Sequence, residues 1–243
     1  MLYDIDWGAF SLIEFFGSKG NQIGSTFKTA LDIGSGDGVH TSIMRDFGLE
    51  VFQVDKYSAK AEYKEDFLNC QFENKFDVVF CSHVIEHQRN VGVFLDKIFD
   101  SLNDNGLLLI SAPKHDAENL IEGHLNCFFT SYFIQHLVHA GFDCRSGKYL
   151  SCSGIENAAI VPKAKNFDLA EREGSGYKWT DKHKERCFFP LTNTIVKHNE
   201  PFFYNCEVLS SPNAKVININ IPLKAKKFGV EICSKRWGIK VAF

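Results

Sequence analysis

The stretch that decides the fold is LDIGSGDGVHT, residues 31–41, in which three glycines at two-residue spacing follow an apolar run. Glycines at the end of a buried strand let the backbone turn sharply and approach a ligand closely. A dinucleotide-binding loop has the pattern G-x-G-x-x-G. Here Val39 occupies the place of its third glycine, which comes one residue early, at Gly38. The loop therefore predicts close contact with a ligand, while its spacing argues against a dinucleotide.

Runs typical of buried strands alternate with runs typical of helices along the first two thirds of the chain. The strand-like runs are 27–34, 49–55, a weaker one at 63–68, 75–82 and 107–113, and the helix-like runs are 7–16, 38–48, 91–102 and 130–142. The strong strand-like runs are almost continuously apolar, which predicts an α/β fold with a parallel sheet covered on both faces. Two further β-like runs, 142–151 and 156–165, have no helix between them. We expect them to pair antiparallel at one edge.

The C-terminal third has a different character. Residues 166–200 are charged and show weak periodicity, whereas four short β-like runs separated by turn residues follow from Phe202 onward. We therefore predict a ligand-binding domain over 1–165, a connecting segment over 166–200 and a small antiparallel β appendage over 201–243.

The composition is that of an ordinary soluble domain. The hydrophobic fraction is 44% and the formal net charge is −3, so no nucleic-acid partner is expected. The N-terminus lacks the basic start of a signal peptide, and no apolar run of 18 residues predicts a membrane span. None of the eight cysteines forms a C-x-x-C pair, which argues against structural zinc and favours a reducing cytoplasm.

The glycine motif has an acid in front of it, which makes the full pattern D-x-G-x-G-x-G over residues 32–38. This pattern resembles the first motif of class I S-adenosylmethionine-dependent methyltransferases of the small-molecule and ubiquinone type. Further similar segments follow in the same order: Asp55 after the second strand-like run, EDF at 65–67, FDVVFCSHVIEH at 76–87, LNDNGLLLISAP at 102–113 and GHLNCFFTSYFIQHLVHAGF at 123–142. The resemblance covers about residues 27–165. It implies a doubly wound, mostly parallel, seven-stranded Rossmann-like sheet that binds S-adenosylmethionine.

The resemblance also assigns residues to the cofactor. Asp55 is expected to accept hydrogen bonds from the ribose hydroxyls, as an acid does at the end of this strand in related folds. Asp66 is expected near the adenine amine. The cofactor-binding residues predicted in this way are Asp32, Gly34, Ser35, Gly36, Gly38, Asp55, Lys56, Asp66, Phe67, Ser82, His83 and Val84.

Methyl transfer from a sulfonium needs an acceptor held in line and, for a hydroxyl, a base that removes its proton. Histidine has a pKa suited to that role near neutrality. From the candidates His83, Glu86, His87, His115 and His124 we predict Glu86, His87 and His124 as the catalytic set. Two plainer interpretations stay open: Glu86 and His87 pack and cap a helix, and His124 is a hydrogen-bonded loop residue.

An acid–histidine pair such as Glu86–His87 has been linked to metal or to substrate in ubiquinone-type O-methyltransferases. The acid expected three residues before Glu86 is His83 in this sequence, so no metal is predicted.

The sequence thus predicts a methyltransferase that acts on a hydroxyl or amine of a small molecule or glycan precursor. Two alternatives come from other functional classes. One is a non-catalytic module that keeps the cofactor-binding fold, and the other is a nicotinamide-dependent oxidoreductase, against which the early third glycine argues.

Overall fold

A six-stranded sheet forms the centre of the computed structural model, which describes residues 1–114, 118, 120–144, 146–152, 156–165, 228–234 and 239–243. The strands are β2 (Thr29–Ile33), β3 (Glu50–Val54), β4 (Phe76–Ser82), β5 (Leu102–Pro113), β6 (Lys148–Cys152) and β7 (Glu156–Pro162). Their order is β3-β2-β4-β5-β7-β6, and β7 runs antiparallel to both of its neighbours while the first four strands are parallel. The doubly wound, mostly parallel sheet with an antiparallel edge is therefore confirmed.

The seventh strand of the prediction is absent from the described residues. The run 63–68 contributes only an isolated bridge between Tyr63 and Val54. Beyond it, a carboxylate oxygen of Asp66 accepts from the amide of Leu68 at 3.0 Å, and the carbonyl of Asp66 accepts from the amide of Asn69 at 2.8 Å. These local bonds form a turn, as Asp side chains commonly do, and they take the place of a strand ladder.

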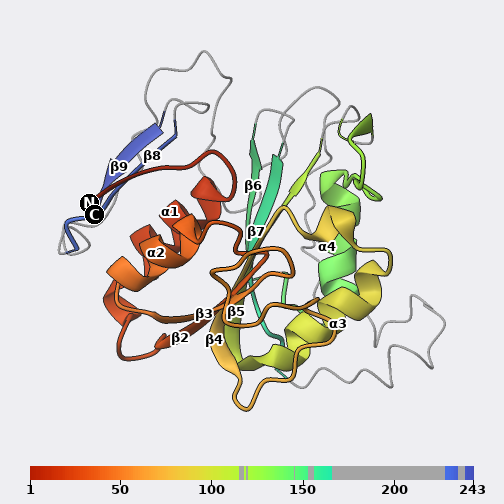
Figure 1. Cartoon of the computed structure of the whole chain (residues 1–243), viewed down its shortest axis with the longest axis horizontal. Helices are drawn as coiled ribbons and strands as arrows, with labels where there is room; N and C mark the ends of the chain where they lie inside the picture. Colours follow the sequence, from red (N-terminus) through yellow and green to blue (C-terminus); the bar gives the residue numbers. More distant parts are fainter. Residues whose placement is uncertain (115–117, 119, 145, 153–155, 166–227, 235–238) are drawn as a thin grey trace.

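Among the described residues, four α-helices cover the two faces of the sheet: α1 (Ala9–Lys19), α2 (Val39–Asp46), α3 (Val91–Ser101) and α4 (Thr130–His139). Figure 1 shows α1 and α2 on one face, with α3 and α4 on the other. Successive strand residues point to opposite faces, so Leu31 packs in the cluster of α3 and α4 while Ala30 packs in that of α1 and α2. Two short 3-10 helices, η1 (Gly20–Gln22) and η2 (Ile85–His87), also occur in the part of the chain that the structure describes.

A second, three-stranded sheet joins the two ends of the chain (Figure 1). It consists of β1 (Leu2–Asp4), β8 (Glu231–Ser234) and β9 (Ile239–Ala242), with β1 parallel and β9 antiparallel to β8. Phe243 packs with its ring centroid 5.1 Å from that of Phe47, inside the cluster that also buries α1. The last two of the four predicted β-like runs, 227–234 and 237–243, thus contain the strands β8 and β9. β8 pairs with β1, an N-terminal strand that was not predicted from the sequence.

The remaining predictions for the C-terminal third concern 166–200 and the β-like runs before residue 228, which lie outside the described residues. The domain limits stay a prediction. Among the helices that the structure describes, none has the length and apolar character needed to cross a membrane.

Candidate active site

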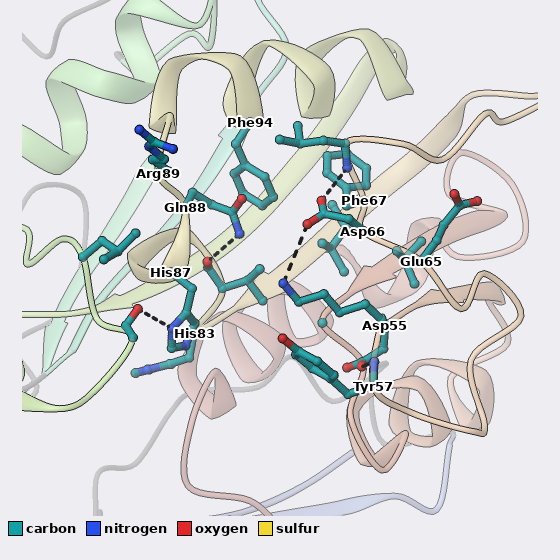
Figure 2. Close-up of a pocket in the computed structure, with 18 of the residues that line it drawn as sticks. Asp55, Tyr57, Glu65, Asp66, Phe67, His83, His87, Gln88, Arg89 and Phe94 are labelled. Atoms are coloured by element: carbon teal, nitrogen blue, oxygen red, sulfur yellow. Dashed lines mark hydrogen bonds and ion pairs between the residues drawn. The ribbon is translucent and has the colours of Figure 1, made fainter.

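A cavity of about 860 Å³ opens at the carboxyl ends of β2, β3 and β4. This is the edge at which open α/β sheets bind their ligands. Figure 2 shows Asp55, Asp66 and Phe67 on one side of the cavity and His83 and His87 on the other. Of the predicted cofactor residues, those lining the cavity are Gly34, Asp55, Lys56, Asp66, Phe67, His83 and Val84.

The glycine loop follows β2 and ends where α2 begins. Gly34 has φ +73°, and a Cβ atom there would lie 2.3 Å from Cγ2 of Val84, so no larger residue fits. Gly36 has φ +51°, and a Cβ there would meet no atom within 4 Å. The loop is therefore packed tightly against Val84 at its first glycine and faces open space at its second.

Asp55 ties this loop to the loop that follows β3. One carboxylate oxygen accepts from the amide of Gly36 at 2.8 Å, and the other accepts from the amides of Tyr57 and Ser58 at 2.8 and 2.9 Å. A carboxylate offers about four acceptor positions. Asp55 is thus held rigidly and keeps the capacity to accept a further hydrogen bond from a ligand.

Asp32, the acid of the same motif, lies behind the cavity. Its side chain accepts from the hydroxyl of Thr41 at 2.6 Å, and only 1% of the residue is exposed. Burial raises the pKa of this carboxyl. Asp32 therefore fastens β2 to α2. Ser35, Gly36, Gly38 and Ser82 likewise do not line the cavity.

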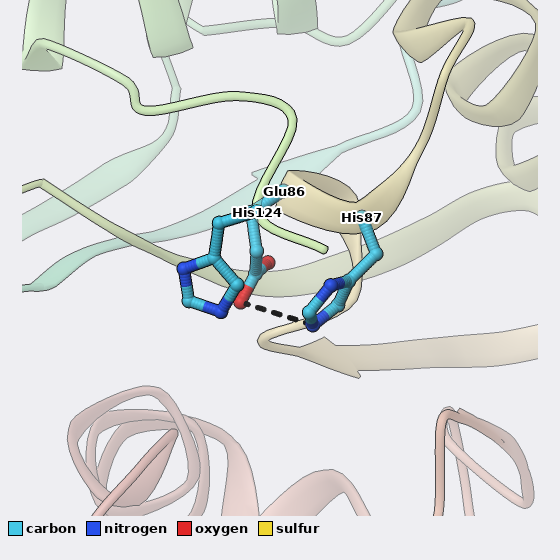
Figure 3. Close-up of side chains that lie close together, drawn as sticks. All are labelled: Glu86, His87 and His124. Carbon is cyan, nitrogen blue, oxygen red and sulfur yellow. Dashed lines mark ion pairs between the residues drawn. The ribbon is translucent and has the colours of Figure 1, made fainter. Parts of the chain in front are cut away.

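The three predicted catalytic residues lie close together (Figure 3), and one of them, His87, lines the other end of the cavity. One potential ligand or base atom from each of Glu86, His87 and His124 lies within 4.8 Å of the others. The backbone carbonyl of Glu86 accepts from the amides of Leu125 and Asn126 at 2.9 and 3.1 Å, which fixes the loop carrying His124 against η2. His115, the remaining candidate, lies outside the described residues.

A backbone carbonyl orients the ring of His87. Its Nδ1 lies 2.9 Å from the carbonyl oxygen of Gly123. A carbonyl only accepts, so Nδ1 carries the proton and Nε2 of the neutral ring presents its lone pair. This Nε2 is 4.0 Å from Oε1 of Glu86. His87 lines the cavity, and His124 does not. The two imidazole rings pack edge to face, with their centroids 4.8 Å apart.

His83 lies between two buried carboxylates. Its Nδ1 is 3.3 Å from Oε1 of Glu86, and its Nε2 is 3.3 Å from Oε2 of Glu156 on β7. Burial opposes protonation of His83, but interactions with Glu156 and Glu86 outweigh it and raise the pKa to about 9. Sequence reasoning missed Glu156, for which the available signal was an acid at the head of an apolar strand.

The Glu86, His87 and His124 donor set is one that a divalent cation such as zinc uses in proteins. However, the protonated His83 already supplies a positive charge next to Glu86. That arrangement agrees with the prediction of no metal, which stays a prediction.

Several cavity residues were not predicted. Tyr57, Gln88 and Arg89 line it, and Tyr57 is 87% exposed. They follow the motif residues Asp55 and His87 by one or two positions. These residue types are not characteristic of a cofactor site, so only their position next to a motif could have indicated them.

The sequence matches the profile of a family described as "Methyltransferase domain" over residues 8–146, more than half of the 243-residue chain. The chain belongs to this methyltransferase family. Membership identifies it as an enzyme of the S-adenosylmethionine-dependent class, with that compound as its cofactor.

Solved structures share the fold. The Burkholderia thailandensis 1,6-didemethyltoxoflavin-N1-methyltransferase, with bound 1,6-didemethyltoxoflavin and S-adenosylhomocysteine, is 16% identical with a TM-score of 0.52, over 65% of this chain and 77% of that chain. An S-adenosylmethionine-dependent methyltransferase from Clostridium acetobutylicum ATCC 824 is 12% identical with a TM-score of 0.51, over 67% and 94%. No curated protein matches the chain in sequence.

Proposed function

We propose that this methyltransferase transfers the methyl group of S-adenosylmethionine to a hydroxyl or amine of a small molecule or glycan precursor. One observation carries the proposal. A single cavity is lined by acids suited to an adenosyl group at one end and by His87, whose Nδ1 lies 2.9 Å from the Gly123 carbonyl, at the other. The donor supplies a methyl group already activated by its sulfonium charge, so the protein needs only to position the acceptor and remove its proton.

The donor end is assigned to Asp55, Asp66 and Phe67. Asp55 is held by three backbone amides and would accept from the ribose hydroxyls. Phe67 supplies an apolar surface and Asp66 a carboxylate, which suits an adenine ring with its exocyclic amine. The left-handed Gly34, which lines the cavity, allows the backbone to approach the ligand.

The acceptor end is assigned to Glu86, His87 and His124. His87 Nε2 would take the acceptor proton, after which the imidazolium faces the Glu86 carboxylate 4.0 Å away. A carboxylate beside the base stabilises the charge that appears when the proton is transferred. A small-molecule acceptor is in keeping with the toxoflavin precursor bound by the Burkholderia protein, although that likeness concerns the fold.

Isothermal titration calorimetry with S-adenosylhomocysteine tests the donor assignment first. We expect binding to the wild-type protein, and no heat at high ligand concentration would refute it. Radiolabelled S-adenosylmethionine with a panel of phenols, sugar nucleotides and amines then tests turnover. Binding without transfer to any of them would favour a non-catalytic module, and thermal stabilisation by NAD in place of S-adenosylhomocysteine would favour an oxidoreductase.

A further inference from the structure

The N-terminal segment crosses the carboxyl end of β4 beside the cavity. The Trp7 ring lies against the His83 ring, with centroids 4.5 Å apart and planes at 46°. The next residue, Gly8, has φ +67°, and a Cβ there would lie 2.7 Å from Oγ of Ser82, the residue before His83. In addition, the carbonyl of Trp7 lies 2.9 Å from Nε2 of His40 on α2. Trp7 is therefore fixed against a residue that lines the cavity.

The C-terminal hairpin holds this segment in place. β1 pairs with β8, and the pairing continues where the amide of Ile5 donates to the carbonyl of Cys233 at 2.9 Å. The hydroxyl of Ser234 donates to a carboxylate oxygen of Asp6 at 3.2 Å, one residue before Trp7. The hairpin is itself anchored, because Ile232 is 0% exposed in the cluster that buries α1.

His83 needs such support. It is a non-glycine residue with φ +55°, a conformation that surrounding structure must enforce. Glu86 and Glu156 hold its two nitrogens, while Trp7 covers the ring. Oε1 of Glu86, 3.3 Å from Nδ1 of His83, is also the atom that Nε2 of His87 faces at 4.0 Å.

We infer that Trp7 is a positioning residue for His83, and that the β8–β9 hairpin belongs to the methyl-transfer site because it holds Trp7 there. This inference rests on the proposed function of the cavity. It joins residues at the two ends of the chain to a site whose motifs all lie between them.

The first test compares Trp7→Leu with Trp7→Phe, which keeps an aromatic ring over His83. The readouts are the side-chain ¹H–¹⁵N signal of His83, assigned by its loss in His83→Gln, and the Kd for S-adenosylhomocysteine. We expect Trp7→Leu to move the His83 signal and to weaken binding about tenfold, the equivalent of 1.4 kcal/mol. Trp7→Phe should restore most of both. A folded Trp7→Leu protein with an unchanged His83 signal and Kd would overturn the inference.

The second test addresses the hairpin with Ser234→Ala and, as a matched control, Lys240→Ala. Lys240 lies on the same hairpin and forms an exposed ion pair with Glu231 at 3.0 Å. We expect Ser234→Ala to move the His83 signal in the direction seen for Trp7→Leu, by a smaller amount, and Lys240→Ala to leave it in place. A lowered melting temperature with an unmoved His83 signal in Ser234→Ala would overturn the role of the hairpin. So would equal shifts in both variants.

These tests are separable from the proposed function. If the wild-type protein binds no S-adenosylhomocysteine, the methyl-transfer proposal fails, whereas the His83 signal still reports whether Trp7 and the hairpin position this residue.

Discussion

The two ends of the cavity are built in different ways. The donor end comes from one stretch of the chain, residues 34–67, in which neighbouring loops are joined by Asp55. The histidine end is assembled from segments far apart in sequence, namely Trp7, the η2 region, the loop at 123–126 and Glu156. Residues close together in the sequence form a motif that can be recognised from the sequence alone. Residues far apart in the sequence meet only because of the order of the strands in the sheet. Variants of His87 and of the donor-end residues should therefore separate binding of the donor from transfer of its methyl group.

The largest effect is expected at the histidine end. His87→Ala removes the proposed base, which lines the cavity, and general-base catalysis typically contributes about 10²–10⁴-fold in rate. Single-turnover transfer from radiolabelled S-adenosylmethionine to an acceptor identified in the panel measures this loss. The Kd for S-adenosylhomocysteine should stay near the wild-type value.

His136→Ala is the matched control for His87→Ala. His136 is an exposed histidine on α4 outside the cavity lining, and its removal should leave the rate unchanged. An unchanged rate in His87→Ala would remove His87 from the mechanism. A loss of rate explained entirely by weaker donor binding would mean that His87 binds the donor. The two ends of the cavity would then not differ in function.

The second-largest effect is expected at the donor end, on the affinity for S-adenosylhomocysteine. Gly34→Ala and Gly24→Ala both place a side chain at positive φ, +73° and +82°, which costs about 1–2 kcal/mol. Only at Gly34 does the new Cβ collide with the cavity wall, 2.3 Å from Val84 Cγ2, whereas at Gly24 it meets nothing within 4 Å. Overpacking of this kind typically costs about 1–3 kcal/mol, so Gly34→Ala should weaken S-adenosylhomocysteine binding about 10- to 100-fold relative to Gly24→Ala. Equal Kd values for the two variants, measured by calorimetry, would show that backbone strain alone is responsible.

These glycines also show how much the sequence could predict. The parallel sheet, the loop at 34–38 and the acid at Asp55 follow from local patterns, because strand, turn and helix are set by neighbouring residues. Asp32 was predicted to bind the cofactor, but it does not line the cavity. The sequence identifies the acid but not its hydrogen bond with the Thr41 hydroxyl, which forms in the interior. Trp7 and Glu156 escaped prediction entirely. Their contacts with His83 span 76 and 73 residues (83 − 7 and 156 − 83), and only the folded sheet brings them together.

Asp55→Asn is expected to have a smaller effect within the donor end. It keeps the shape of the side chain but removes the charge that accepts three backbone hydrogen bonds. Hydrogen bonds to charged groups contribute roughly 1.5–3 kcal/mol, and the Asn oxygen keeps part of this, so the S-adenosylhomocysteine Kd should rise about tenfold. Asp37→Asn is the control, because its side chain is 92% exposed and lies 3.8 Å from Lys60. Equal effects in both variants would point to net charge instead of a defined contact.

An acid at the opposite edge of the sheet should affect stability without affecting binding. Asp77 accepts from the amides of Lys28 and Thr29 at 2.8 and 3.1 Å and from Asn103 at 2.8 Å. Burial acts to raise the pKa of Asp77, but these hydrogen bonds outweigh it and lower the pKa. Its stabilisation is therefore present above the ordinary carboxyl pKa and is lost as pH falls through the lowered value.

Asp77→Asn should accordingly reduce the free energy of unfolding at pH 7 by about 1 kcal/mol, allowing for the partial exposure of the site. Urea titrations at pH 7 and pH 3 measure the difference, which should shrink at the lower pH. A changed Kd for S-adenosylhomocysteine would show that the two edges of the sheet are coupled.

The smallest effect is expected when metal ions are added or removed, with the melting temperature as the measured quantity. Glu86, His87 and His124 present the atoms that a zinc ion would use, yet Glu86 already has the protonated His83 3.3 Å away. A cation bound there would face the His83 charge at close range, so EDTA or added zinc should leave the melting temperature unchanged. His83→Gln sharpens the test, because it removes that charge while leaving all three donor atoms in place. Stabilisation by zinc in this variant but not in the wild type would mean that His83 is what excludes a metal from the histidine end. Stabilisation of the wild type would show instead that zinc binds at the histidine end despite the nearby His83, and the histidine end would then act by a different chemistry from the one assigned to His87.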